Sequence, residues 1–221
     1  MRPRTARLIA VLALLLAGCG TGARPGLLGA VGPGSFQWMA PIALSGTGDS
    51  AVDINKPDNQ PALVWATHDG AGPFVVVNFD ETHNRIDTLF DAVGEYKGMV
   101  LIDLIPEENT TRFSVTADGA WDLAVLPLSA APEVRFSQGY VGGGDQVVRT
   151  TLDGPGTLIL KVYPGAAPKP FVVTGVSDKG RELLVNETGV YDGGSVPLDA
   201  STRLLTVQAG GGWLLTIIPA Q

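Results

Sequence analysis

Apolar and polar residues alternate with a period of two along much of the chain after residue 36. The clearest segments are 113–115 and 121–125 and, further on, 205–207 and 213–217, where every second residue is apolar. None of these short segments supports the continued stripe of apolar residues at positions i, i+3 and i+4 that an amphipathic helix needs. The pattern therefore predicts β-strands.

Other short apolar runs separated by turn residues extend this prediction. The chain contains 29 Gly and 16 Pro, which interrupt it too often for long helices. Residues 117–120 and 209–212 are typical of tight hairpins. Further predicted strands cover residues 62–67, 74–79, 99–105, 147–151, 157–162, 171–176 and 181–185.

The predicted elements occur twice. A Gly-x-Tyr-x-Gly element at residues 94–98 returns at residues 189–193, which is 95 positions later (189 − 94). Three other segments recur in the same order: 48–52 as 144–148, 73–76 as 170–173, and 121–127 as 213–219. Conserved order at nearly constant spacing indicates an internal duplication of a domain-sized unit. We define copy 1 as residues 36–128 and copy 2 as residues 129–221, with 129–132 as a short linker.

Each copy is predicted to form an antiparallel β-sandwich of seven or eight strands, so the fold class is all-β. A jelly-roll-like and an immunoglobulin-like strand order both fit the pattern. Trp121 and Trp213 occupy equivalent positions and are expected to fill the two cores.

The N-terminus has a different composition. Three arginines within the first seven residues precede an apolar run at residues 8–17, and the run ends in Leu16-Ala17-Gly18-Cys19. This order resembles the signal peptide and lipobox of bacterial lipoproteins. The resemblance implies cleavage after residue 18 and lipid attachment to Cys19, the only cysteine. An ordinary secretory signal with an incidental cysteine is the alternative.

The lipobox resemblance also implies a location. Several acyl chains on one residue give stable anchoring, so the protein is expected on the extracytoplasmic face of a bacterial cell membrane. Residues 19–35 are rich in Gly and Pro and are predicted to form a flexible tether spanning roughly 20–25 Å. Without residues 1–18 the chain has 12 basic and 22 acidic residues, a net charge of −10. Without a basic patch, nucleic acid is not expected as a partner.

The order of Gly-Asp, apolar strand, Gly-x-Tyr-x-Gly and closing Trp strand resembles small secreted β-sandwich modules of the pre-peptidase C-terminal and CUB-like groups. The resemblance implies an accessory role, in which such modules bind calcium, glycans or proteins. It implies no cofactor other than Ca²⁺.

Two pairs of equivalent residues are candidates for this binding. Tyr96 and Tyr191 could form an aromatic platform for sugar rings, or could fold back on the sandwich edge as parts of a turn. Asp49 and Asp145 could each ligate Ca²⁺ together with backbone carbonyls, or could cap their own loops as Asx-turns.

His68 is the third candidate for ligand binding. It lies in copy 1, where residues 44–127 contain 14 acids and 4 bases, against 7 and 6 in residues 140–219 of copy 2. A Ser-His-Asp site around His68 is conceivable, but the sequence has neither a Gly-x-Ser-x-Gly elbow nor a His-Glu-x-x-His motif. His68 and His83 are therefore expected in loops, and no catalytic activity is predicted.

These observations lead to three hypotheses. The first is a membrane-anchored, non-catalytic binding or accessory module for an envelope protein or glycan. The second is a structural spacer at the cell surface. The third is an enzyme of unrecognised type centred on His68.

Overall fold

The computed structural model describes residues 31, 33–36, 39–152, 154–163, 169–189 and 191–220. The predicted signal peptide, Cys19 and most of the predicted tether lie outside these ranges. The described part consists of strands and two short 3-10 helices, η1 (Pro33–Phe36) and η2 (Leu128–Ala130). None of its helices is long and apolar enough to cross a membrane. The all-β prediction is confirmed.

Copy 1 forms two four-stranded sheets, with strand orders β1-β8-β3-β6 and β2-β7-β4-β5. Neighbouring strands in both sheets are antiparallel. Its strands are β1 (Ile42–Thr47), β2 (Ser50–Asp53), β3 (Ala62–His68), β4 (Pro73–Phe79), β5 (Arg85–Val93), β6 (Tyr96–Ile102), β7 (Arg112–Ala117) and β8 (Ala120–Leu126).

Copy 2 repeats this arrangement with one added strand. Its sheets have the orders β10-β17-β12-β15 and β14-β13-β16-β11-β9, where β9 pairs in parallel with β11. Its strands are β9 (Glu133–Val134), β10 (Gly139–Gly143), β11 (Gln146–Thr150), β12 (Gly156–Val162), β13 (Pro170–Ser177), β14 (Gly180–Thr188), β15 (Asp192–Leu198), β16 (Thr202–Gln208) and β17 (Gly212–Pro219).

The strand order distinguishes the two topologies that the sequence left open. In each copy the first strand pairs with the eighth, the eighth with the third and the third with the sixth. The second, seventh, fourth and fifth strands form the facing sheet. This is the strand order of a jelly roll, an eight-stranded double sheet built from two Greek keys.

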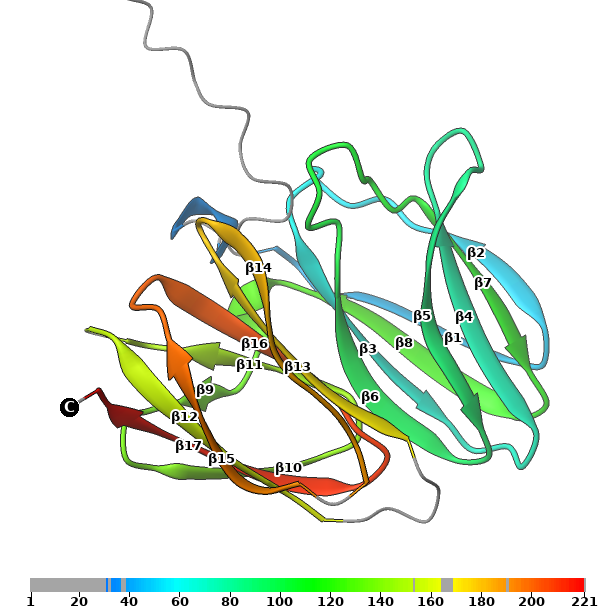
Figure 1. Ribbon diagram of the computed structural model, residues 1–221. Helices are drawn as coiled ribbons and strands as arrows, with labels where there is room; N and C mark the ends of the chain where they lie inside the picture. Colours follow the sequence, from blue (N-terminus) through cyan, green and yellow to red (C-terminus); the bar gives the residue numbers. More distant parts are fainter. Residues whose placement is uncertain are drawn as a thin grey trace, which may run out of the picture.

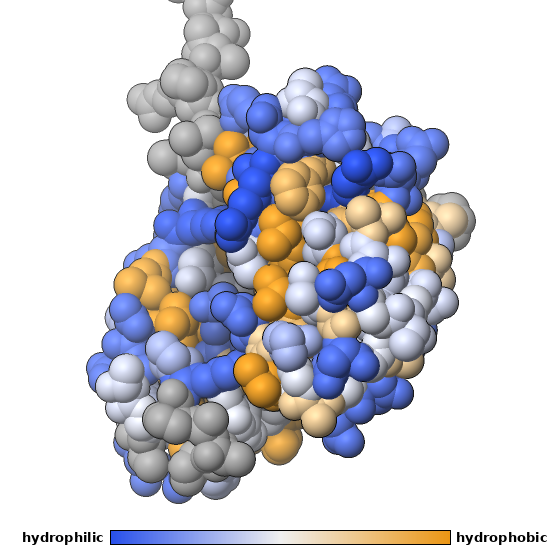
Figure 2. All heavy atoms as spheres, turned by 90° about the vertical axis from the view of Figure 1, so that its right-hand side faces the viewer, coloured by the Kyte–Doolittle hydropathy of each residue, from blue (hydrophilic) through white to orange (hydrophobic). Residues whose placement is uncertain are grey.

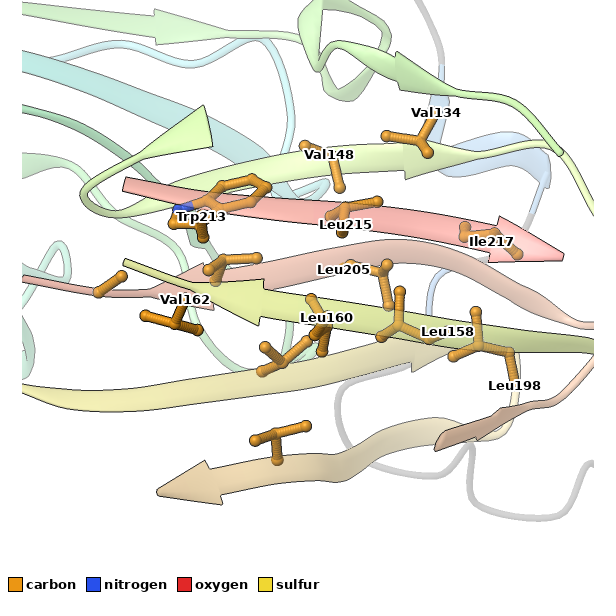
Figure 3. Close-up of a cluster of buried hydrophobic side chains, with 14 of the residues drawn as sticks. Val134, Val148, Leu158, Leu160, Val162, Leu198, Leu205, Trp213, Leu215 and Ile217 are labelled. Atoms are coloured by element: carbon orange, nitrogen blue, oxygen red, sulfur yellow. The ribbon is translucent and has the colours of Figure 1, made fainter. Parts of the chain in front are cut away.

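Alternating burial along the strands explains why each sandwich closes. In β8 and β17 every second side chain is buried, beginning with Trp121 and Trp213. Figure 3 shows Trp213, Leu215 and Ile217 along β17 on the same side as Leu158 and Leu160 of β12. Both tryptophans are almost fully buried, which agrees with their expected place in the cores. Burial of such large side chains is the main driving force for packing the two sheets.

The two copies stack sheet against sheet (Figure 1). The β1-β8-β3-β6 sheet of copy 1 faces the β14-β13-β16-β11-β9 sheet of copy 2, and we call these two the joint sheets. The other two are the outer sheets. A third hydrophobic cluster fills the joint, with Leu63 and Leu128 from copy 1 and Val147 and Leu204 from copy 2 all fully buried or nearly so. The cluster turns two sandwiches into a four-layered body.

One residue of the predicted tether belongs to this joint. Val31 is fully buried in the third cluster, and its N–H donates to the carbonyl of Ser177 in copy 2 at 2.7 Å. The prediction of a flexible tether up to residue 35 is therefore wrong at Val31, because apolar burial and a backbone hydrogen bond hold this residue in place.

Candidate functional site

Asp49 serves to join two hairpins of copy 1. Gly48, which has a positive φ of 71°, donates its N–H to the carbonyl of Gly119 at 3.0 Å. The indole Nε1 of Trp121 donates to the carbonyl of Gly48 at 2.9 Å. Asp49 Oδ1 accepts a hydrogen bond from the N–H of Ala117 at 3.0 Å. Three hydrogen bonds thus hold the β1–β2 turn against the β7–β8 turn.

Copy 2 contains the same three bonds. The N–H of Gly144, at φ 65°, donates to the carbonyl of Gly211 at 3.0 Å, and Trp213 Nε1 donates to the carbonyl of Gly144 at 3.0 Å. Asp145 Oδ1 accepts from the N–H of Ala209 at 3.0 Å. The Gly-Asp and Trp segments therefore recur together because they form one contact.

Both aspartates thus bond a strand more than sixty residues away, so the Asx-turn expectation for Asp49 and Asp145 is wrong. Each aspartate links two turns of its own sandwich, so the two side chains lie in different copies. No group of three or more His, Cys, Asp or Glu side chains in the described ranges is placed to hold a metal ion. Calcium binding at either aspartate stays a prediction.

Tyr96 connects the two copies. Its hydroxyl donates to Asp145 Oδ2 at 2.8 Å, and its ring packs against Phe74 and Phe90 in the core of copy 1. Burial, and next the negative charge of Asp145, raise the pKa of the Tyr96 hydroxyl far above its usual value. Beside this pair, the N–H of Met99 donates to the carbonyl of Asp145 at 2.8 Å.

Tyr191 has no such partner among the described residues. It is half-buried, and its ring packs against Phe171 with the centroids 6.1 Å apart. Its hydroxyl lies over Gly194, where a Cβ would collide with it, just as the Tyr96 hydroxyl lies over Gly98. Both hydroxyls therefore lie over a glycine of their own sandwich, but that of Tyr96 bonds the Asp145 carboxylate rather than a backbone group. Sugar binding by Tyr96 or Tyr191 stays a prediction.

His68 is the last residue of β3 and is buried, so its expected place in a loop is wrong. Its ring stacks on Phe74 with the centroids 4.8 Å apart. Nδ1 lies 2.9 Å from the carbonyl of Gly94, and Nε2 lies 3.2 Å from Asp118 Oδ1 but outside hydrogen-bond geometry. Asp118 Oδ2 accepts from the N–H of Gly72 at 2.7 Å. The imidazole thus packs beneath the three turns that contain Gly72, Gly94 and Asp118. His83 does lie in a turn, at φ 63°.

A second buried polar cluster lies in the loops that follow β2 and β6. Lys56 Nζ contacts Asp103, and both side chains are almost fully buried. Thr110 Oγ1 donates to Asp103 Oδ1 at 2.6 Å and accepts from Asn78 Nδ2 at 2.8 Å. Lys56 Nζ also donates to the carbonyl of Gln60 at 2.9 Å. Because charge and hydrogen bonds are matched within it, this cluster stabilises the loops.

A cleft of about 270 Å³ opens at one edge of the joint, and we call it the junction cleft. Trp65 reaches it from β3 of copy 1 and Tyr140 from β10 of copy 2. Tyr140 donates its hydroxyl proton to Gln146 Oε1 at 3.1 Å, and burial raises the pKa of that hydroxyl. The complete lining is Trp65, Lys97, Gly98, Met99, Pro132, Tyr140, Gly143, Gln146 and Val147.

The junction cleft combines aromatic surface with hydrogen-bonding groups. Lys97 is exposed and has no ion pair among the described residues. A second cleft in the joint shares Met99, Gln146 and Val147 with it but has no aromatic side chain in its lining. Ligand sites often lie between domains and combine aromatic walls with a few polar groups. The junction cleft fits this description better than the second cleft does.

Trp65 and Tyr140 are not among the residues predicted from the sequence, because those predictions rely mainly on residues that are repeated in both copies. Repetition favours residues that the fold itself needs twice. Trp65 corresponds to Ile159, because Trp65 pairs with Ala124 in β8 and Ile159 pairs with Thr216, the residue of β17 equivalent to Ala124. A signal was present in this difference: an aromatic residue at an outward strand position of one copy only.

Comparisons with known proteins add little to this description. No protein-family model matches the chain, and no curated protein matches it. Among solved structures, PBSX exported protein XepA is 10% identical over 81% of this chain and 84% of its own, with a TM-score of 0.26. A protein from Parabacteroides distasonis described as secreted is 9% identical over 89% and 98%, with a TM-score of 0.24. The stem and receptor binding domain of the spike protein P1 from bacteriophage PM2 is 10% identical over 84% of this chain and 81% of its own, with a TM-score of 0.17.

Proposed function

We propose that this protein is a lipid-anchored, extracytoplasmic, non-catalytic module that binds a glycan of the bacterial cell envelope in the junction cleft. The observation that carries the proposal is that Trp65 of copy 1 and Tyr140 of copy 2 line one cleft together with Lys97 and Gln146. The lipobox at residues 16–19 supports the anchor.

The lining of the cleft suits a sugar ring. A pyranose presents C–H groups on its faces and hydroxyls around its rim, so it packs against an aromatic ring and exchanges hydrogen bonds at its edge. Lys97 offers an ammonium donor, and the Tyr140 hydroxyl oxygen can accept a hydrogen bond. The volume of about 270 Å³ lies just below the usual range for drug-sized ligands and suits one or two rings.

Binding would be tested by titrating the full protein, in detergent micelles, with purified envelope polysaccharide and with defined di- and trisaccharides. Trp65→Ala is expected to weaken binding at least tenfold, since it removes one aromatic wall. Tyr163→Ala is the matched control, because Tyr163 is an exposed aromatic residue of copy 2 outside the cleft lining. Equal affinities of the two variants, or no binding by the unaltered protein, would contradict the proposal.

Anchoring would be tested separately, by labelling cells with a radioactive fatty acid and fractionating the membranes. The protein is expected to carry label and to sediment with membranes, and Cys19→Ser is expected to abolish both. Release of unlabelled protein into the medium would instead favour an ordinary secretory signal.

A structural spacer remains the second candidate, and one specific observation favours it. The apolar joint, with the Tyr96–Asp145 hydrogen bond at its edge, makes a stiff unit of two sandwiches. A spacer needs the joint but not the cleft. If the protein acts as a spacer, the Trp65→Ala variant should correct the envelope phenotype of a deletion strain as fully as the unaltered protein does.

A further inference from the structure

The duplication leaves two surfaces without the partner that their counterparts have. The joint sheet of copy 2 contains the second, fourth, fifth and seventh jelly-roll strands, as does the outer sheet of copy 1. The joint sheet of copy 1 likewise corresponds to the outer sheet of copy 2. The two outer sheets therefore correspond, strand for strand, to the two sheets that form the internal joint.

The outer sheet of copy 1 keeps an apolar surface at its centre. Val75, Val77 and Phe79 of β4 point outward and are half-buried. They correspond to Val172, Thr174 and Val176 of β13, which line the joint. Figure 2 shows a hydrophobic column on this side of the molecule, bordered by hydrophilic residues.

The outer sheet of copy 2 is apolar at matching positions. Ile159 takes the place of Trp65, and Ile218 takes that of Leu126, a residue packed in the joint. On the same sheet, Val141 of β10 lies opposite Leu214 of β17, and Val141 is 76% exposed. Val141, Ile218 and Ile159 lie on the three neighbouring strands β10, β17 and β12, and association would bury this surface.

The two residues that form the polar contact of the joint also have counterparts on the outer sides of the molecule. Within the chain, Tyr96 of copy 1 bonds Asp145 of copy 2. Their counterparts are Tyr191 of copy 2 and Asp49 of copy 1. Asp49 is exposed, and neither its Oδ2 nor the Tyr191 hydroxyl has a hydrogen-bond partner in the described part of the chain.

We propose that copy 2 of one molecule docks on copy 1 of the next, through Ile159, Ile218 and Tyr191 on one side and Val77, Phe79 and Asp49 on the other. The contact repeats the internal joint and joins two different surfaces, so it continues from molecule to molecule as a row or a ring rather than as a two-fold symmetric dimer. Charge supports this pairing, because residues 44–127 carry −10 and residues 140–219 carry −1. Two copy 1 surfaces would repel each other more strongly.

The contact between molecules is expected to be weaker than the internal joint. Arg112 replaces the buried Leu204, and Thr157 replaces the buried Leu63. These substitutions remove apolar area from the contact, so assembly requires a high local concentration. Anchoring in one membrane would supply that concentration.

The test uses a bismaleimide crosslinker on membranes that contain the full chain with Asp49→Cys and Tyr191→Cys. A ladder of dimers, trimers and higher species is expected. Each single variant is expected to give no crosslink when expressed alone, and the two single variants expressed together are expected to stop at dimers. The unaltered chain, with Cys19 only, is the control for reaction at the N-terminus.

A second set of variants tests the apolar surfaces in the doubly substituted chain. Val77→Asp or Ile159→Asp is expected to abolish the ladder, whereas Leu183→Asp, at an exposed site on neither outer sheet, should preserve it. Absence of any ladder would overturn the proposal. Dimers formed by the Asp49→Cys variant alone would also overturn it, because they would show copy 1 meeting copy 1.

Discussion

The hydroxyl of Tyr96 in copy 1 donates a hydrogen bond of 2.8 Å to Oδ2 of Asp145 in copy 2. The other carboxylate oxygen of Asp145 accepts the N–H of Ala209 and closes the sandwich of copy 2. One side chain therefore stabilises both a sandwich and the joint. The equivalent Asp49 stabilises only its own sandwich.

Replacing Tyr96 by Phe should lower the free energy of unfolding by about 1–3 kcal/mol, because it leaves a half-buried carboxylate oxygen without a donor. Urea denaturation followed by tryptophan fluorescence measures this change. Tyr191→Phe should change the free energy by less than about 0.5 kcal/mol. A double-mutant cycle with Asp145→Asn should give a coupling energy of at least about 0.5 kcal/mol, and additive effects would show that the bond contributes nothing.

Replacing Gly142 by Ala should destabilise the protein by about 1–3 kcal/mol, because the new Cβ would collide with the buried indole ring of Trp213. The neighbouring Gly143 is a matched control. A Cβ there would meet no heavy atom within 4 Å. Gly143→Ala should stay within about 0.5 kcal/mol of the unaltered protein in urea or thermal unfolding. Equal losses at both positions would contradict the packing described for Trp213.

Stability should fall at alkaline pH because of Tyr96. The folded state raises the pKa of this hydroxyl, whereas in the unfolded chain it loses its proton near pH 10. The resulting stabilisation is fully present below about pH 10 and is lost as the pH rises further. Between pH 10 and 11 the unaltered protein should lose about 1 kcal/mol more than Tyr96→Phe, because the unfolded hydroxyl is already half ionised at pH 10. Parallel pH profiles of the two proteins would refute this assignment.

Replacing His68 by Ala should cost about 2–5 kcal/mol, because a buried ring stacked on Phe74 is lost. His83→Asn is the comparison, since His83 is exposed and Asn tolerates its positive φ. That variant should unfold within about 0.5 kcal/mol of the unaltered protein. If His68→Ala were as stable as His83→Asn, the imidazole would be free for a role other than packing.

Alternation predicted the strands whose outward residues are polar and whose inward residues are apolar. It predicted β8 and β17 around their tryptophans, because these strands have one buried and one more exposed side. It missed β15, where Gly194 makes room for Tyr191 and Pro197 lies on an edge strand. It also predicted no strand for β5. There two bulges, one opposite Val76 and Val77 and one opposite Asn78 and Phe79, break the period of two.

The duplication identified the right residues but not their roles. Gly48, Asp49 and Trp121 recur because Trp121 bonds Gly48 and Asp49 bonds Ala117, each across some seventy residues of sequence. No local pattern shows such a contact. The joint was harder still to predict, because an outward Leu63 or Leu204 in a strand reads as part of a sandwich core. Only the strand order shows that those side chains face the other copy.

Val31 lies N-terminal to every strand of copy 1, yet its N–H bonds Ser177 of copy 2. Under the proposed lipid anchor, mechanical load from the N-terminal side of the chain would enter at the joint and be shared by both sandwiches. A shear force at that point must first extract a fully buried valine before it can strain either jelly roll. Attachment at the joint would let the protein resist drag on the cell surface as one body.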